Sequence, residues 1–245
     1  LLVPVTMEAA QDGREVTKEA ELTVVHLSDL HCEDTNKNPE PIFPLDPHVK
    51  DLVHSFEWLR AAVQDINRDV NPDMVVITGD IANHGGDVGS LRRARRILEG
   101  LECPYYPVIG DHGGPGPFRE VFGRPLNYSF SRGGWRFIAL DCHTGAVSEE
   151  GLRLLRRELQ ELPPDVPAVV MLHRPLVISP IIQYLARKLY SRGLDLEPGN
   201  AEEILDILDE HSGVKAILSG HIHTNTVQRR NGVLLVTAGS LVENP

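Results

Sequence analysis

The segment Leu22-Thr-Val-Val-His-Leu-Ser-Asp-Leu-His31 joins an apolar run directly to a carboxylate and an imidazole. Its first six residues are short enough for a strand and too apolar to have one face in water, so they predict a buried strand. Four further runs have the same character: Met74–Ile77, Tyr106–Ile109, Ala168–Leu172 and Val214–Leu218. The chain therefore contains five segments that we expect to be buried strands.

Segments with helical spacing lie between these runs. They cover Val49–Asp69, Val88–Leu98, Glu149–Leu162 and Ala201–His211. A chain that alternates strands with helices predicts an α/β fold with right-handed crossovers. In open sheets of this kind ligands bind at the carboxyl ends of the strands, so side chains that follow different strands can converge in one cleft.

Each of the five apolar runs ends in a short motif of carboxylates or imidazoles. The motifs are Asp29-x-His31, Gly79-Asp80, Gly110-Asp111-His112, His173 and Gly220-His221-x-His223. Carboxylate and imidazole suit metal ions such as manganese, iron, zinc or nickel, and no Cys cluster indicates a structural zinc site. Asp80 is the natural bridge between two ions, and such a pair can polarise phosphoryl oxygens and lower the pKa of bound water. The motifs thus predict metal-assisted hydrolysis of a phosphate ester.

Length and composition are typical of one globular enzyme. The chain has 245 residues, of which 41% are hydrophobic and 24% charged. We expect residues 1–21 to be an irregular N-terminal extension and residues 22–245 to form a single catalytic domain. No stretch approaches the roughly 18 to 20 apolar residues of a membrane span, so no transmembrane segment is expected. The formal net charge of −11 argues against non-specific binding to nucleic acid, which needs a basic surface.

The cysteines and the N-terminal residues favour a cytoplasmic protein. Cys32, Cys103 and Cys142 are odd in number and lack the close spacing of a thiolate metal site. We therefore expect them to be reduced and mostly buried. The first residues also lack the basic, apolar and cleavage-site sequence of a signal peptide.

In order, spacing and strand context the five motifs resemble the calcineurin-like metallophosphoesterase family, and the likeness extends from about Leu22 to Ser240. The resemblance implies a four-layer α-β-β-α fold, in which helices flank a two-sheet β-sandwich. It also implies additional strands at Asn127–Phe130, Trp135–Leu140 and Val233–Thr237.

The resemblance further implies a site for two metal ions. The first ion would be held by Asp29, His31, Asp80 and His223, and the second by Asp80, Asp111, His173 and His221. His112 would contact the phosphate or protonate the leaving group. The nucleophile would be hydroxide held by both ions and not a side chain.

The chain departs from the family pattern at two positions. Where the family usually has Gly-Asn-His followed by an acidic residue, this chain has Gly110-Asp111-His112-Gly113. Ionised Asp111 offers no amide donor to a substrate and adds a negative charge, which should tighten metal binding and repel an anionic substrate. Gly113 removes a carboxylate that could orient His112.

Several functions fit these motifs. The first expectation is a phosphodiesterase for a small nucleotide or cyclic-nucleotide-like substrate. A phosphomonoesterase or phosphoprotein phosphatase is the alternative, and Asp111 also leaves open an attenuated module that binds metal and phosphate without turnover. Asn83 stands three residues after Asp80, where purple acid phosphatases are expected to have Tyr.

Residues beside the motifs are candidates for substrate recognition. His84 and Arg174 are predicted to contact the substrate. The Pro-rich segment Cys32–Pro47 follows His31 directly and is a candidate specificity loop. The segment 174–198, expected to be helical from about Ile181, could be a lid, a homodimer contact, a membrane-surface anchor or a helix packed against the domain.

Overall fold

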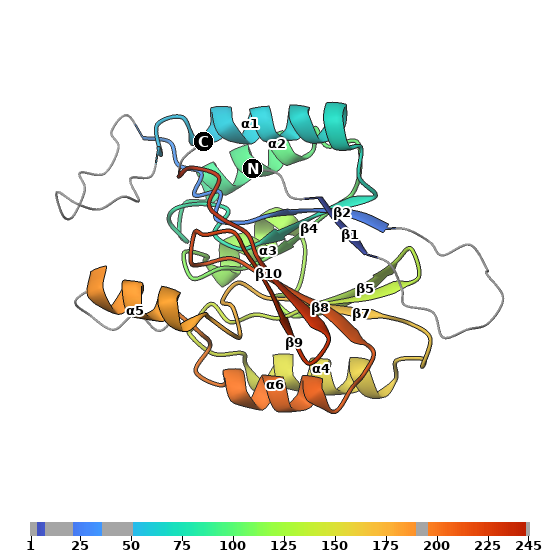
Figure 1. Ribbon diagram of the computed structural model, residues 1–245. Helices are drawn as coiled ribbons and strands as arrows, with labels where there is room; N and C mark the ends of the chain where they lie inside the picture. Colours follow the sequence, from blue (N-terminus) through green and yellow to red (C-terminus); the bar gives the residue numbers. More distant parts are fainter. Residues whose placement is uncertain (1–3, 8–21, 36–50, 190–195, 244–245) are drawn as a thin grey trace.

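Two β-sheets lie face to face between two layers of helices in the computed structural model, which describes residues 4–7, 22–35, 51–189 and 196–243 (Figure 1). Helices α1 (Ser55–Asp65) and α2 (Val88–Leu98) lie above the sheets in Figure 1, and α4 (Glu149–Gln160) and α6 (Ala201–Asp209) lie below them. The predicted four-layer α-β-β-α fold is confirmed.

The first sheet has the strand order β1-β2-β3-β4. Its strands are β1 (Pro4–Met7), β2 (Leu22–Leu27), β3 (Met74–Thr78) and β4 (Tyr105–Val108). The last three strands are mutually parallel, and β1 pairs with β2 in the antiparallel sense. Every residue of β3 is buried, because helices cover one face of this sheet and the second sheet covers the other.

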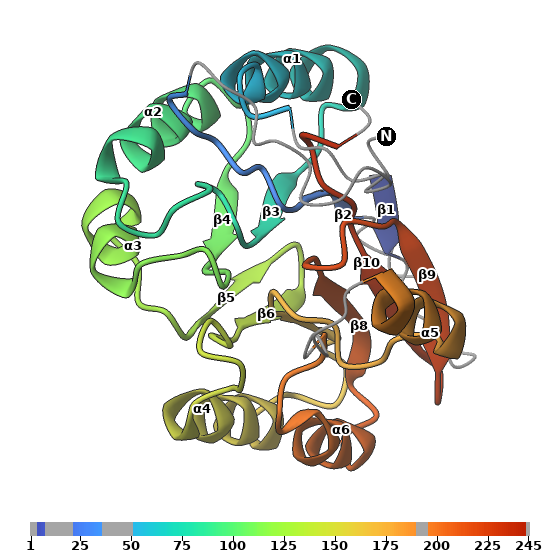
Figure 2. The ribbon, with the colours of Figure 1, turned by 90° about the vertical axis from the view of Figure 1, so that its left-hand side faces the viewer.

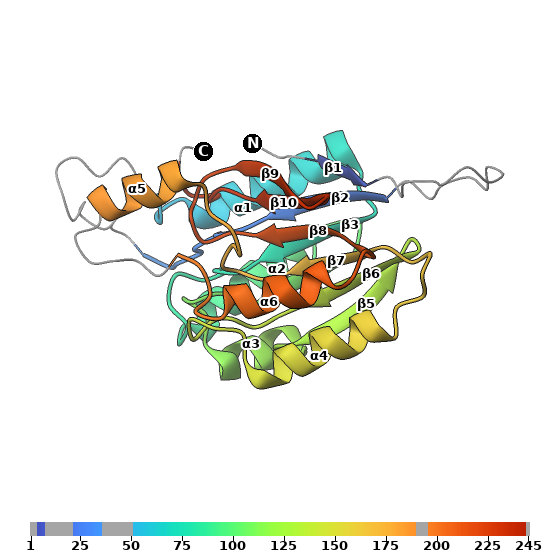
Figure 3. The ribbon, with the colours of Figure 1, turned by 60° about the horizontal axis from the view of Figure 1, so that its bottom comes forward.

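The second sheet has the strand order β5-β6-β7-β8-β10-β9. Its strands are β5 (Tyr128–Arg132), β6 (Trp135–Ala139), β7 (Ala168–Met171), β8 (Val214–Ser219), β9 (Thr226–Arg230) and β10 (Val233–Thr237). The four inner strands are parallel, and β5 and β9 form antiparallel edges. Figure 3 shows α4 and α6 side by side over the outer face of this sheet.

Apolar clusters fill the three spaces between the four layers. Val76 of β3 packs with Phe137 and Met171 between the two sheets. A second cluster joins the first sheet to α1 and α2, and a third joins the second sheet to α4 and α6. Because both faces of each sheet are covered, most residues of the inner strands are apolar and buried.

Some elements differ from the sequence-based expectation. The sequence Gly-Pro-Gly at 114–116 is typical of a loop, but Pro115 begins helix α3 (Pro115–Phe122), whose Phe118 and Val121 are buried. Proline fits the first turn of a helix, where its missing N–H is not needed. The predicted helix at Val49–Asp69 begins only at Ser55 and continues beyond α1 as the π-helical turn η1 (Ile66–Val70).

The terminal and loop predictions are only partly within the described residues. Strand β1 lies inside the extension 1–21 that was expected to be irregular, and residues 1–3 and 8–21 lie outside the described part of the chain. Residues 36–47 of the candidate specificity loop also lie outside it. Helix α5 (Pro180–Leu189) begins one residue before its predicted start.

All three cysteines are free, and Cys32 and Cys142 are buried, as predicted. Over the described ranges, no helix has both the length and the apolar character that crossing a membrane needs.

Candidate metal centre

The loops that follow the parallel strands meet at one end of the two sheets, which faces the viewer in Figure 2. Backbone hydrogen bonds tie these loops together in sequence-distant pairs. His31 N donates to Asp80 O at 2.8 Å, and Gly220 N donates to His173 O at 2.8 Å. The five motifs therefore lie in one place, as predicted from their position at strand ends.

The backbone of this centre is strained. Seven described residues other than glycine have φ in the left-handed region, and five of them belong to the motifs. They are Asp29, His31, Asp80, His221 and His223, with φ between 41° and 71°. Each such residue costs about 1–3 kcal/mol and persists only where the surrounding structure enforces it. Backbone strain of this kind is typical of functional sites.

The glycine of three motifs allows the side chains to approach closely. A Cβ atom on Gly110 would collide with Oδ1 of Asp80, and one on Gly220 would lie 2.5 Å from Oδ2 of Asp29. Gly79 has φ of 105° and would collide with the His173 ring if it carried a side chain. The glycines of these motifs are therefore a packing requirement of the centre.

Asp29, His31 and His223 form a first group that could hold a metal ion. Nε2 of His223 lies 3.3 Å from Oδ1 of Asp29 and 3.1 Å from Nε2 of His31. Asp29 and His31 are fully buried. Nδ1 of His223 bonds to Glu243, which directs the opposite ring nitrogen at the other two side chains.

Asp111, His173 and His221 form a second group. Oδ1 of Asp111 lies 3.3 Å from Nε2 of His173, and Oδ2 of Asp111 lies 3.5 Å from Nδ1 of His221. Nδ1 of His173 donates to the carbonyl oxygen of Thr78 at 2.7 Å. When the ring is neutral, its Nε2 therefore offers a lone pair to the centre.

Asp80 lies between the two groups. Its Oδ2 is 3.2 Å from Nε2 of His173 and 3.9 Å from Nε2 of His31. Its Oδ1 accepts a hydrogen bond from the backbone N–H of His112 at 2.9 Å. One oxygen thus faces both groups while the other holds the loop after β4.

Three buried atoms of the centre have the character of metal ligands. Oδ1 of Asp29, Oδ1 of Asp111 and Nε2 of His173 have no hydrogen-bond partner among the described residues. A buried polar atom without a partner is costly, and native structures normally satisfy it. Coordination of a metal ion would satisfy all three atoms, so the residues present fit a metal centre.

The carboxylates and imidazoles shift one another's pKa. Burial alone would raise the pKa of Asp80, but His173 and His31 hold it well below its usual range. Burial opposes protonation of His173 and His223, yet the neighbouring carboxylates raise the pKa of His173 well above its usual range and that of His223 to about 9. Burial and the charge of His173 lower the pKa of His221 to about 4.

His112 lies at the exposed side of the centre, with its ring 4.9 Å from that of His31. Nδ1 of His112 bonds to the carbonyl oxygen of Asn83 at 2.7 Å. The Asn83 side chain donates to Glu33 at 2.7 Å. A backbone carbonyl therefore orients His112 in this chain, in which Gly113 replaces the usual acidic residue.

The two predicted substrate contacts have different surroundings. His84 has 68% of its side chain exposed, lies 3.7 Å from Oε1 of Glu33 and belongs to neither metal group. Arg174 is 14% exposed, and its Nη2 lies 2.7 Å from Oδ2 of Asp111. Sequence reasoning missed Glu243, because nothing in its spacing links it to His223.

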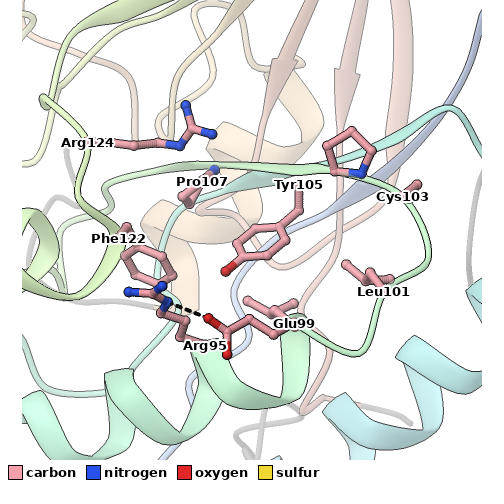
Figure 4. Close-up of a pocket in the computed structure, with 10 residues that line it drawn as sticks. Arg95, Glu99, Leu101, Cys103, Tyr105, Pro107, Phe122 and Arg124 are labelled. Atoms are coloured by element: carbon pink, nitrogen blue, oxygen red, sulfur yellow. Dashed lines mark hydrogen bonds and ion pairs between the residues drawn. The ribbon is translucent and has the colours of Figure 1, made fainter.

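A separate cavity of about 370 Å³ lies beside the carboxyl end of α2 (Figure 4). Its lining includes Tyr105, Phe122 and Arg124, and Figure 4 shows Arg95 paired with Glu99 at its wall. It contains no residue of the five motifs.

Comparison with known proteins identifies the family. The sequence profile of calcineurin-like phosphoesterases matches residues 22–225. The chain belongs to this family. Family and fold imply a dinuclear site for divalent metal ions, and the described residues include four groups of side chains that could hold one.

Relatives and solved structures agree with this assignment. A probable cyclic nucleotide phosphodiesterase of Synechococcus sp. is 31% identical over 178 residues, which are 69% of this chain and 65% of that protein. A 3',5'-cyclic-nucleotide phosphodiesterase of Nostoc sp. is 27% identical over 66% of this chain and 59% of that protein. The chain thus spans less than two thirds of either relative. A dimetal phosphatase of Danio rerio has the same fold, with a TM-score of 0.67 and 17% identity over 91% of this chain and 89% of that one.

We predict that Gly110→Ala will weaken manganese binding by roughly 10–100-fold, the range found when groups that support metal ligands are disturbed. The added methyl group would displace the Asp80 carboxylate. Gly116→Ala is the matched control, because no atom lies within 4 Å of its added Cβ. Calorimetric titration with manganese measures both variants, and equal affinities would contradict the close approach at Gly110.

We also predict that metal binding releases protons. At about pH 7.5, below the raised pKa values of His173 and His223, both imidazoles hold a proton in the metal-free protein. An imidazole must lose this proton to become a metal ligand, so binding should release roughly two protons at this pH and fewer as the pH rises through about 9. Titration in two buffers of different ionisation enthalpy counts these protons. Glu243→Gln should reduce the count, and binding without proton release would refute this account.

Proposed function

We propose that this chain is a metal-dependent phosphodiesterase that hydrolyses a small nucleotide or cyclic-nucleotide-like diester. The observation that carries the proposal is that one oxygen of Asp80 lies within 4 Å of an imidazole from each metal group, 3.2 Å from His173 and 3.9 Å from His31. The phosphodiesterase names of the relatives support a diester as the substrate class.

The proposed metal ligands follow from the two groups. The first ion would be held by Asp29, His31, Asp80 and His223, and the second by Asp80, Asp111, His173 and His221. Two such ions, of manganese, iron, zinc or nickel, would polarise the phosphoryl oxygens and lower the pKa of the attacking water.

The chain's own contribution to proton transfer would come from His112. Its backbone N–H is held by Asp80, and its Nδ1 is held by the Asn83 carbonyl. These two bonds fix the ring and leave Nε2 to protonate the departing oxygen of the ester. The imidazole is exposed at the centre, so a substrate can reach it. His84 lies 3.7 Å from Oε1 of Glu33, whose other carboxylate oxygen accepts from Asn83, and it would contact the substrate from the rim.

A second candidate function follows from Asp111. The third carboxylate raises the negative charge of the centre and opposes the binding of an anionic substrate. A module that holds metal and phosphate with attenuated turnover is therefore the alternative.

Hydrolysis of two related substrates tests the proposal. With manganese bound, the chain should hydrolyse bis(p-nitrophenyl) phosphate faster than p-nitrophenyl phosphate. The two substrates have the same leaving group, so their rates compare the ester class alone. Asp80→Ala should lose both metal pairing and hydrolysis. A faster monoester reaction would replace the diesterase by a phosphomonoesterase or phosphoprotein phosphatase. No hydrolysis despite full metal loading would favour the attenuated module.

We also propose a domain organisation and a partner class for the protein. Residues 22–245 would act as one catalytic domain on a small phosphate ester, without non-specific binding to nucleic acid. The homodimer and the cytoplasmic location stay predictions.

We predict that His112→Ala will lower the turnover number by roughly 10²–10⁴-fold, the usual contribution of a positioned general acid. Metal content should not change, because the Asp80 contact comes from the His112 backbone. His211→Ala is the control, since His211 precedes β8, whereas the metal-centre motif with His221 and His223 follows the opposite end of this strand. Turnover and metal content are measured on the same samples. An unchanged turnover number would remove His112 from this role.

A further inference from the structure

Arg174 forms an ion pair with a carboxylate of the candidate metal centre. Its Nη2 lies 2.7 Å from Oδ2 of Asp111, and the exposed fractions of the two side chains are 14% and 20%. The pair connects the loop after β4 with the loop after β7. Because Arg174 follows His173 directly, the same loop supplies an imidazole and a guanidinium to the centre.

The two oxygens of Asp111 have different surroundings. Oδ1 is buried, has no hydrogen-bond partner in the described structure and lies 3.3 Å from Nε2 of His173. Oδ2 bonds to Arg174. One oxygen is therefore directed at the metal group, and the other is held by a permanent cation.

Arg174 is also distinctive in the charge balance of the centre. Asp29 and Asp80 form ion pairs only with imidazoles in the described part of the chain. Asp111 additionally has the guanidinium of Arg174. A guanidinium carries five N–H donors in a planar fork, so it can hold a carboxylate and a phosphate at once.

We propose that Asp111 and Arg174 act as one unit, in which Asp111 binds metal through Oδ1 while Arg174 cancels its charge and binds the phosphate of the substrate. The inference rests on the proposed function and deepens it. An amide at position 111 would be neutral and would carry its own donor. Here the carboxylate and the guanidinium share these two roles.

The unit predicts opposite effects on metal and anion. Arg174→Met removes the cation, so Asp111 becomes a stronger ligand and manganese should bind several-fold more tightly. Inorganic phosphate should bind the manganese-loaded protein at least roughly ten-fold more weakly, because a charge-assisted hydrogen bond and the neutralising charge are both lost. A residue that only supports the fold would weaken both affinities together.

The experiment is calorimetric titration of the full chain with manganese, and then of the loaded protein with inorganic phosphate. Arg136→Met is the matched control, because Arg136 of β6 forms a partly buried ion pair with Glu158 of α4, on the outer face of the second sheet. It should change neither affinity. Arg174→Lys keeps the charge without the fork, so it should retain near-native manganese affinity and bind phosphate with intermediate strength.

A double-variant cycle tests the coupling. In an Asp111→Asn background the side chain at position 111 is a neutral amide, so Arg174→Met should leave manganese affinity unchanged and weaken phosphate binding less than in the native background. Equal losses in both backgrounds, or weaker binding of both manganese and phosphate in Arg174→Met, would overturn the unit. Because these readouts do not need turnover, an Arg174-dependent phosphate affinity without diester hydrolysis would support the unit and refute the diesterase.

Discussion

The main physical constraint on the centre is the electrostatic repulsion among three carboxylates that lie close together. Asp29 is fully buried, and only 3% of Asp80 is exposed. Burial would favour the neutral acid in each, yet neighbouring imidazoles keep the pKa values of both below their usual range. The carboxylates are therefore charged, and the surrounding protein must supply cations. In the metal-free chain these cations are the protonated imidazoles of His173 and His223, together with the guanidinium of Arg174.

This arrangement is unfavourable locally and is stabilised by the rest of the fold. Left-handed backbone at five motif residues stores strain where the carboxylates meet, and the close approach there leaves no room for a Cβ on the motif glycines. Three apolar clusters hold the strands rigidly, and hydrogen bonds between the loops, such as that from His31 N to Asp80 O, fix their ends. The packed layers of the sandwich thus fix the positions of the motif side chains, which the loops by themselves would not hold.

The sequence predicts the buried strands well because both faces of each sheet are covered, which makes the strands predominantly apolar. It also locates the motif residues, since parallel strands end at the same edge. The sequence does not predict strand β9, because its residues alternate between half-buried and exposed and none is buried. It does not predict α3, because the first residues of this helix are Pro and Gly. The Asn83 carbonyl that orients His112 is a backbone group, so no side chain in the sequence indicates it. Glu243 contacts His223 only through the tertiary fold.

The cations of the centre differ in what they do when a metal arrives. An imidazole must give up its proton to become a ligand, so the positive charge on His173 and His223 is replaced by that of the ions. The guanidinium of Arg174 cannot be deprotonated in a protein and keeps its charge in both states. It therefore offsets the negative charge of Asp111 throughout, and an approaching phosphate meets a centre whose third carboxylate is already neutralised. On this argument Asp111 is compatible with an anionic substrate because Arg174 stands beside it.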